Sequence, residues 1–448
     1  MRARDRALWA LASTVCVLLL LAPALWNGFP LLQYDTGGYL ARWYEGILVP
    51  SRAVVYGLML TASVPLGLWP VLLLQSALTV WLVALTLRAH RLGGRPWLLL
   101  GVIAALSVVT TLPWLTAILL TDIFAGLGVL ALYLVVMRGE ALGGRERLAL
   151  MLLVAVSAAS HSATLAVLLA LLLAGVALFP FDRRRSRLTG IWRGLIALTL
   201  GVVLVFAADY VVAKRLAYTP GGFALSFGRM LQDGIVSKYL DAHCPAAKLK
   251  LCAYQDQLPH YADVWFWGSP LFDRLGRFAG LGAEMEQIAV ASVLAYPALQ
   301  AETAALATGK QLIDVRTGEG VVTAIWHTYA IIERYTPQLG PAMRAARQQA
   351  GDIGFSAINR LHYPLALMAM ALLPLIMLLA WRATLPPDIG ELAATVTLAL
   401  LANAFVCGAL SNPHDRYGAR MVWLASLAVA LALARTRRPT RDILPTPG

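Results

Sequence analysis

The chain has 448 residues, of which 59% are hydrophobic and only 14% charged, and its formal net charge is +13 at pH 7. This composition excludes an ordinary soluble domain and predicts an integral membrane protein. The isoelectric point near 9.8 does not indicate nucleic-acid binding. The basic residues are mostly scattered arginines beside apolar runs, where they act as topology signals.

The first apolar run, residues 7–26, is long enough to span a bilayer and follows three arginines in the first six residues. If those arginines stay in the cytoplasm, the run delivers Asp35 to the outer surface. A cleaved signal peptide is the alternative, because residues 22–24 are like a small-residue cleavage site. The length of the apolar run favours an uncleaved anchor.

Further apolar runs predict about ten membrane-spanning helices, with both termini in the cytoplasm. They cover residues 7–26, 69–87, 96–112, 123–137, 148–160, 163–180, 191–210, 363–381, 392–410 and 418–434. The pair 148–160 and 163–180 has an alternative, one long helix that would invert the later topology. The basic cluster of Arg183, Arg184 and Arg185 belongs inside and favours the pair.

The predicted fold is therefore an all-α polytopic membrane protein with one large periplasmic insert. The chain divides into an N-terminal membrane module, a polar periplasmic segment and a C-terminal membrane module, which cover residues 1–210, 211–361 and 362–448. Within the polar segment, residues 284–312 predict two amphipathic helices, broken at Pro297, that rest on the membrane part.

This topology places the candidate functional side chains on the outer face. Asp35, in Gln-Tyr-Asp-Thr-Gly-Gly-Tyr, is either a catalytic carboxylate or an ordinary turn residue. Asp122 begins a span as a helix cap that can also be a ligand. His161 lies between two serines and is either a polar turn residue or a catalytic group. No charged residue falls near the middle of a predicted span, which argues against an ion-coupled transporter.

The densest polar cluster between apolar runs is the turn at residues 414–417. It is either a simple membrane-edge turn or a phosphate site. In a phosphate site, Arg416 would bind through its forked guanidinium, His414 would donate a hydrogen bond, and Tyr417 would complete the pocket. Arg52 is a further candidate for stabilising the phosphate.

The polar segment contains Cys244 and Cys252, and an outer, oxidising location predicts a disulfide between them. The alternative is a metal pair with His243 and His260, although this spacing matches no compact zinc pattern. The two remaining cysteines lie in predicted spans and are expected to be apolar filler.

In layout and short motifs the chain resembles the GT-C superfamily of membrane glycosyltransferases, which includes protein O-mannosyltransferases and the aminoarabinose transferase of lipid A. In that family the first outer loop carries an acidic catalytic residue, which Asp35 matches. A second acid in the next outer loop is matched by Asp122, and a late Arg-Tyr turn is similar to residues 414–417. The resemblance covers residues 1–210 and 362–435.

Two features depart from the family pattern. Many members have paired acids in the first loop, whereas Asp35 stands alone and is followed by Thr36. This puts binding of a divalent cation in doubt. The segment 211–361 is also unlike the soluble domain at the end of larger oligosaccharide transferases, so the acceptor does not carry over.

The resemblance implies an inverting glycosyltransferase of a bacterial inner membrane, which uses a polyprenyl-phosphate sugar at the periplasmic face to modify cell-envelope glycans or glycolipids. Asp35 would be the general base that takes a proton from a lipid, glycan or protein acceptor. Arg416 and His414 would stabilise the departing phosphate. Asp122 would orient the acceptor or a metal ion.

Two other classes stay open. A lipid or glycolipid transporter without chemistry would keep its activity after the loss of Asp35. An O-antigen-type polymerase or ligase would place its active residues in the long polar segment, with Arg229, His243 and His260 as candidates.

Overall fold

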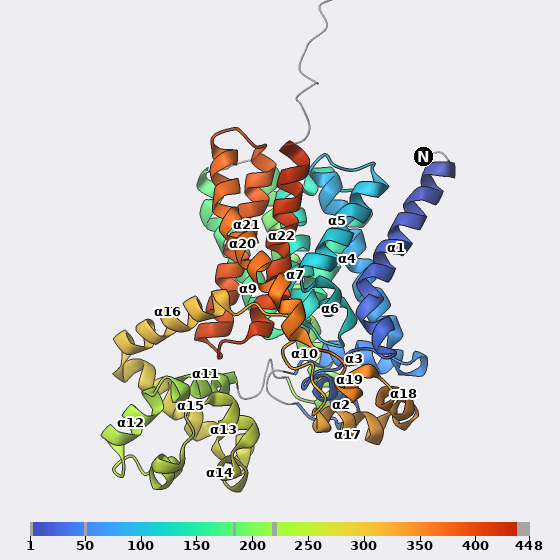
Figure 1. Ribbon diagram of the computed structural model, residues 1–448. Coiled ribbons are helices and arrows are strands. Elements are labelled where there is room, and N and C mark those ends of the chain that lie inside the picture. Colours follow the sequence, from blue (N-terminus) through green and yellow to red (C-terminus); the bar gives the residue numbers. More distant parts are fainter. Residues whose placement is uncertain (1–2, 49–51, 182–184, 217–221, 437–448) are drawn as a thin grey trace, which may run out of the picture.

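The computed structural model describes residues 3–48, 52–181, 185–216 and 222–436, and within these ranges every regular element is a helix. The helices form three groups: a bundle of long helices, a layer of short helices at one end of it, and a small lobe beside that layer (Figure 1). Helices suit a membrane protein because a segment inside a bilayer satisfies its own backbone hydrogen bonds only as a helix. Arg2, Arg183 and Arg184, which support the predicted topology, lie outside the described residues.

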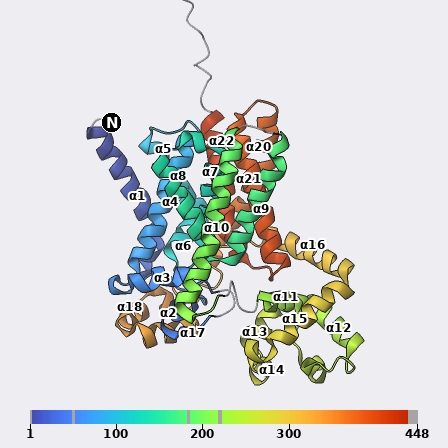
Figure 2. The ribbon, with the colours of Figure 1, turned by 180° about the vertical axis from the view of Figure 1, so that it is seen from behind.

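The bundle contains the helices that cover the predicted apolar runs (Figures 1 and 2). These are α1 (Ala3–Asn27), α4 (Trp69–Ala89), α5 (Pro96–Val109), α7 (Asp122–Met137), α8 (Gly144–Ser160), α9 (Ser162–Leu178), α10 (Arg185–Ala213), α20 (Phe355–Trp381), α21 (Pro387–Ala404) and α22 (Asp415–Thr436). The start of α1 and the last turn of α22 lie at the same end of the bundle, which we call the distal end. The end beside the layer and the lobe is the lobe end.

Seven helices in the described ranges are long and apolar enough to cross a membrane. Six of them belong to the bundle: α1, α4, α10, α20, α21 and α22. The span that contains α21 continues beyond this helix to Ala409. The prediction of a multi-pass α-helical membrane protein is confirmed, but the count of ten spans is not. The other bundle helices have 14 to 17 residues, so each is about 21–26 Å long, short of a hydrocarbon core of about 30 Å.

The chain turns back between α8 and α9. His161 separates the two helices with an extended backbone (φ −159°, ψ 129°), and the helices then pack against each other. The out-and-back pair is therefore formed, and the alternative of one long helix is excluded.

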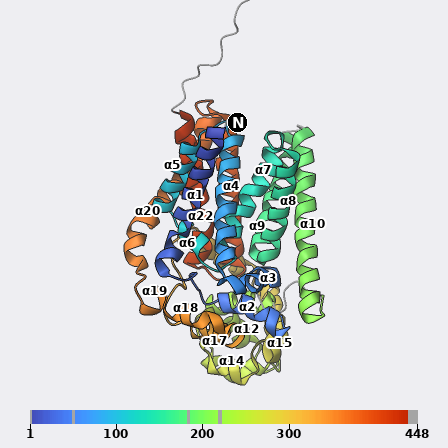
Figure 3. The same ribbon diagram turned by 90° about the vertical axis from the view of Figure 1, so that its right-hand side faces the viewer.

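Short helices from two distant parts of the chain make up the layer at the lobe end (Figure 3). They are α2 (Thr36–Glu45), α3 (Val54–Ser63), α17 (Trp326–Tyr335), α18 (Gly340–Arg344) and α19 (Arg347–Ala350). Helix α17 crosses α2 at Gly37, where a Cβ would lie 2.8 Å from the Cα of Thr328. Glycine at this position lets the two backbones meet. The Thr328 hydroxyl also donates to the carbonyl oxygen of Gln33 at 3.0 Å, which fixes the loop that leads to Asp35.

The lobe has a hydrophobic core of its own, built around Phe227, Trp265, Phe272 and Met285. Its helices are α11 (Gly222–Gln232), α12 (Ile235–His243), α13 (Ala262–Gly268), α14 (Pro270–Arg274) and α15 (Arg277–Ala295). Helix α15 is the seventh helix with the length and composition of a span, yet its inner face packs into the lobe. Apolar composition alone does not separate these two environments.

Helix α16 (Pro297–Ile313) leads from the lobe to the bundle, where it contacts α21 and α22 (Figures 1 and 2). The predicted helix break at Pro297 is present, because α15 ends at Ala295 and α16 begins at Pro297. Of the two predicted amphipathic helices, α16 contacts the bundle, through its C-terminal half, whereas α15 packs into the lobe. The polar segment 211–361 thus contributes both to the lobe and to the layer.

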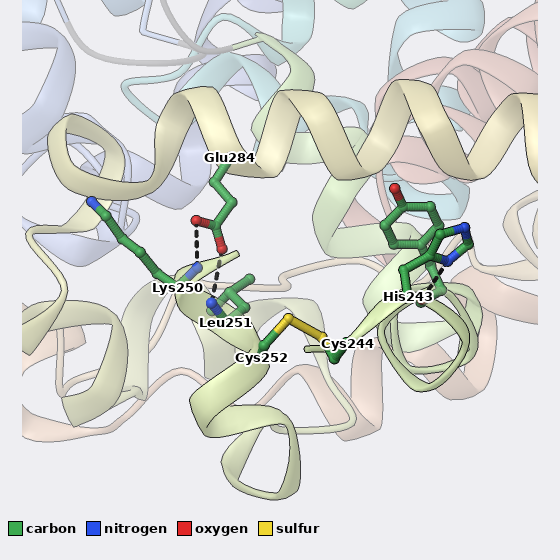
Figure 4. Close-up of a disulfide and its surroundings, with 7 residues drawn as sticks. His243, Cys244, Lys250, Leu251, Cys252 and Glu284 are labelled. Carbon is green, nitrogen blue, oxygen red and sulfur yellow. Dashed lines mark hydrogen bonds between the residues drawn. A yellow bond between two sulfur atoms is a disulfide. The ribbon is translucent and has the colours of Figure 1, made fainter. Parts of the chain in front are cut away.

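The predicted disulfide between Cys244 and Cys252 is confirmed (Figure 4). The carboxylate of Glu284, on α15, accepts hydrogen bonds of 2.8 Å from the backbone N–H groups of Lys250 and Leu251. These bonds fasten the disulfide loop to the core of the lobe. The alternative of a metal pair with His243 and His260 is excluded, since both sulfur atoms are used in the disulfide.

Candidate functional site

The loop that carries Asp35 is bound to the segment that precedes α7. The backbone N–H of Leu119 donates to the carbonyl oxygen of Leu31 at 3.0 Å, and the Thr36 hydroxyl donates to the carbonyl oxygen of Leu119 at 3.1 Å. These bonds hold the start of α2 against the start of α7, which brings Asp35 towards Asp122.

Asp35 directs its carboxylate away from its own helix. It occupies the N-cap position of α2 but makes no side-chain cap hydrogen bond, which leaves both carboxylate oxygens available to other partners. Oδ1 accepts a hydrogen bond from Nη2 of Arg52, and Oδ2 accepts one of 2.6 Å from Nη1 of Arg416. Asp35 is therefore bound by two arginines from different parts of the chain.

Arg416, near the start of α22, connects the two predicted acids. Its Nε donates to Oδ2 of Asp122 at 2.6 Å, while Nη1 holds Asp35. The side chain of Asp122 is 1% exposed and that of Arg416 is 11% exposed. The backbone N–H of Arg416 also donates to Oε2 of Glu319 at 2.7 Å, which fixes the start of α22. The structure thus brings together the three residues on which the sequence interpretation depends most.

A third arginine, Arg420, lies one turn further along α22 and was missed from the sequence. Its side chain is fully buried, its Nη2 donates to Oδ1 of Asn403 at 2.8 Å, and its Nη1 is 3.8 Å from Oδ1 of Asp122. Residues four apart share one face of a helix. The spacing between Arg416 and Arg420 was therefore the signal that could have identified it.

We call Asp35, Arg52, Asp122, Arg416 and Arg420 the ionic cluster. It contains three arginines and two carboxylates, so positive charge is in excess. Burial raises the pKa of Asp35, but the charges of Arg52 and Arg416 outweigh this effect and lower the pKa to about 2. In this arrangement Asp35 is ionised at neutral pH and is a weak base.

His414 occupies a different place from the phosphate-binding position expected for it. Its Nδ1 is 2.6 Å from Oε1 of Glu319, and its Nε2 is 3.4 Å from Oδ2 of Asp263 on α13. Burial lowers the pKa of His414, but the hydrogen bonds with Asp263 and Glu319 raise it to about 9. The charged imidazole therefore ties the lobe to the start of α22, two residues from Arg416. The sequence held no signal for this contact, because both acids come from the non-periodic polar segment.

His161 lies close enough to the ionic cluster for the charges of the cluster to affect its pKa. Its Nδ1 accepts a hydrogen bond of 3.2 Å from the backbone N–H of Ala163 and so caps α9. Burial, with the charges of Arg420 and Arg416, holds its pKa well below the usual value. His161 is thus a neutral capping residue at the edge of the site.

Two tyrosines flank the arginines. The ring centroid of Tyr417 is 5.8 Å from the guanidinium carbon of Arg416 and 5.4 Å from that of Arg420. The ring of Tyr39 is 6.0 Å from that of Arg52. At these distances an aromatic face attracts a cation, so the two rings help to hold the arginines in place.

Arg229, a candidate from the polar segment, is bound inside the lobe. Its Nη1 donates to Asp233 at 2.7 Å and to Thr303 at 3.0 Å. It therefore braces α11 against α16. Its third partner, Gln300, also lies on α16, so the structure does not bring Arg229 to Asp35.

The carboxylates of the ionic cluster do not fit a divalent cation in this arrangement, because the guanidinium of Arg416 lies between Asp35 and Asp122. Across the described ranges, no group of three or more histidine, cysteine, aspartate or glutamate side chains is placed to hold a metal ion. Arginine supplies the positive charge between the two acids.

Comparison of the chain with protein-family models, with curated proteins and with solved structures found no match. The fold and the ionic cluster define the protein at the level of a multi-pass α-helical membrane protein with a buried group of arginines and carboxylates at one end of its bundle.

Proposed function

We propose that the protein transfers a sugar from a polyprenyl-phosphate donor to an acceptor at the lobe end of the bundle. The observation that carries the proposal is the ionic cluster, in which three arginines meet two carboxylates. Burying such charges is costly, and apolar residues of similar volume often stabilise a core equally well. A function that requires charge explains the cluster better than a need for stability.

The excess of arginine suits the phosphate of the donor. Arg52 and Arg416 have planar, forked guanidinium groups, which match phosphate oxygens in pairs. Both of them now hold Asp35. A bound phosphate competes with that carboxylate for the same N–H groups.

This competition prepares Asp35 for catalysis. The charges of Arg52 and Arg416 keep its pKa near 2. When the phosphate neutralises them, the pKa of Asp35 rises towards its ordinary value, and the carboxylate becomes a stronger base. The base is thus strengthened only in the complex with the donor.

The transfer itself is a single displacement, with inversion at the anomeric carbon. The acceptor hydroxyl or amine attacks that carbon while Asp35 takes its proton, and the bond between the sugar and the phosphate oxygen breaks. Polyprenyl phosphate leaves with one more negative charge than it had in the donor. Arg52 and Arg416 stabilise this charge, and Asp122 keeps Arg416 in position.

The distribution of arginines supports an outer, periplasmic location of the lobe end in a bacterial inner membrane. The lobe is tied to the start of α22 through His414, which supports a role for the lobe in covering the site and selecting the acceptor. The acceptor is a lipid, a glycan or a protein of the cell envelope.

The proposal is tested by binding of undecaprenyl phosphate to the purified protein, measured by native mass spectrometry. Arg416→Lys keeps the charge but loses the fork, and we expect its affinity to fall about tenfold, which corresponds to about 1.4 kcal/mol. Asp35→Asn removes the competing charge, so its affinity should stay the same or increase.

Arg229→Lys is the matched control, since it makes the same change at a buried, ion-paired arginine in the lobe. It should bind like the unmodified protein. Unchanged affinity in Arg416→Lys contradicts the proposal. A loss of affinity confined to Arg229→Lys would support the polymerase or ligase class instead.

A further inference from the structure

A cavity of about 810 Å³ lies at the distal end of the bundle. Its wall includes the last turns of α4, α7 and α22 and the first turns of α10 and α21. Helix α7 connects the two ends, because it begins at Asp122 in the ionic cluster and ends at Met137 in the cavity wall. The volume lies within the range of about 300–1,000 Å³ that is usual for small-molecule sites.

Seven arginines line this cavity, but only two acids. Some of the arginines brace the helices: Arg138 and Arg187 share Glu391, each at 2.5 Å. Arg88 donates to Oε1 of Glu146 at 2.8 Å. These pairs account for part of the positive charge and hold the walls together.

Arg147 on α8 and Arg193 on α10 complete the wall without such pairing. Both are half-buried, and among the residues that the structure describes neither has a carboxylate within ion-pair distance. An Nη1 atom of Arg193 reaches across to within 3.4 Å of the Cβ position of Gly139, after α7. Within the described ranges, two guanidinium groups from different helices therefore bring positive charge without a carboxylate partner to one concave site.

A topology signal does not explain this arrangement. Arginines that fix the orientation of a membrane protein need only lie near the correct face of the bilayer. They need not converge on a cavity, where burial weakens their hydration and concentrates their positive potential. Guanidinium forks in such a place match the oxygens of a phosphate.

We infer that the distal cavity is a second binding site, which takes an anion that contains a phosphate group, with Arg147 and Arg193 as its principal ligands. The phosphate is either the headgroup of an anionic phospholipid or a soluble phosphate compound. Basic pockets between membrane helices bind anionic headgroups. The inference is independent of the proposed sugar transfer, because it concerns the opposite end of the bundle.

The test compares two double variants of the full-length protein, purified in detergent. Arg147→Gln/Arg193→Gln removes both of these positive charges from the cavity wall. Arg95→Gln/Arg145→Gln is the matched control, because these arginines lie at the same end, are exposed and are not part of the cavity wall. Each protein is titrated with phosphatidylglycerol, with phosphatidylcholine and with inorganic diphosphate, and binding is followed by native mass spectrometry.

For phosphatidylglycerol we expect at least a tenfold loss of affinity in the cavity variant and none in the control. Phosphatidylcholine should bind weakly to all three proteins. This result supports the site and identifies the phosphate as that of a lipid. The same pattern with diphosphate alone supports the site with a soluble ligand. Equal affinities in the two double variants, or no binding of either anion to the unmodified protein, overturn the inference.

Discussion

Both ends of the helix bundle gather arginines, but they balance the charge differently. At the lobe end, Arg416 holds two carboxylates, and Asp35 in turn is shared between Arg416 and Arg52. At the distal end, seven arginines and two acids line one cavity. Some of these arginines form ion pairs with Glu146 and Glu391, which are not part of the cavity wall. The number of arginines at one end of the bundle therefore does not distinguish a topology signal from a binding site. The partners and the burial of each guanidinium do.

The largest expected difference between the two ends follows from removing one acid at each. Asp122→Asn leaves Arg416 and Arg420 buried without a full counter-charge, and breaking a buried ion pair in this way costs about 3–5 kcal/mol. Glu140→Gln at the distal cavity changes an exposed side chain, so its effect should stay within about 0.5 kcal/mol. Unfolding of the purified proteins measures both. Similar stability of the two variants would remove the distinction between the ends.

The disulfide gives the lobe end a covalent constraint in addition to its ion pairs. Replacing Cys244 and Cys252 by serine opens a loop with a sequence separation of eight, which should lower the stability of the lobe by about 2–3 kcal/mol. Hydrogen exchange should then speed up in α12 and α15, while peptides from the bundle serve as the internal control. Unchanged exchange in the lobe would show that its hydrophobic core is sufficient alone.

The smallest expected effect on stability comes from the ionic contacts of His414 with Asp263 and Glu319. The pKa of His414 is raised to about 9 in the folded protein, whereas an unperturbed histidine titrates near 6.5. The folded state therefore binds the proton more tightly, so the stabilisation is complete below about pH 6.5 and is lost as the pH rises through about 9. We expect about 1–2 kcal/mol of lobe stability to disappear across this interval.

His414→Gln should remove this pH dependence, which thermal unfolding of the lobe between pH 6 and 9.5 can measure. His327→Gln is the matched control, because His327 is an exposed histidine on α17 in the neighbouring layer. If both variants lost the pH dependence of lobe stability to the same extent, His414 would not be its source.

Much of this architecture could be predicted from the sequence, because apolar runs and arginine positions are local signals. They predicted the bundle helices, the turn between α8 and α9, and the disulfide. The convergence of Asp35, Asp122 and Arg416 also followed, since the predicted topology placed all three at the same end. The count of ten spans did not follow, because four of the ten apolar runs form helices of only 14 to 17 residues, which are shorter than a hydrocarbon core of about 30 Å.

The partners inside the site were beyond sequence reasoning. Glu319 and Asp263 reach His414 from polar stretches without periodicity, and nothing local indicates such contacts between distant segments. Arg52 was a candidate for the phosphate, and its bond to Asp35 emerges only in three dimensions. The distal cavity was hidden for a related reason: each of its arginines, taken singly, has the position of a topology signal.

The proposed sugar transfer requires Asp35 as its base. Asp35→Asn keeps the size of the side chain but cannot accept the proton. The measurement is mass analysis of envelope glycans and glycolipids in a deletion strain that carries either the unmodified or the Asp35→Asn protein, at equal amounts in the membrane. The unmodified protein should restore the missing sugar, whereas Asp35→Asn should lower its transfer by about 10²–10⁴-fold. Full restoration by Asp35→Asn would contradict the catalytic role and favour a transporter.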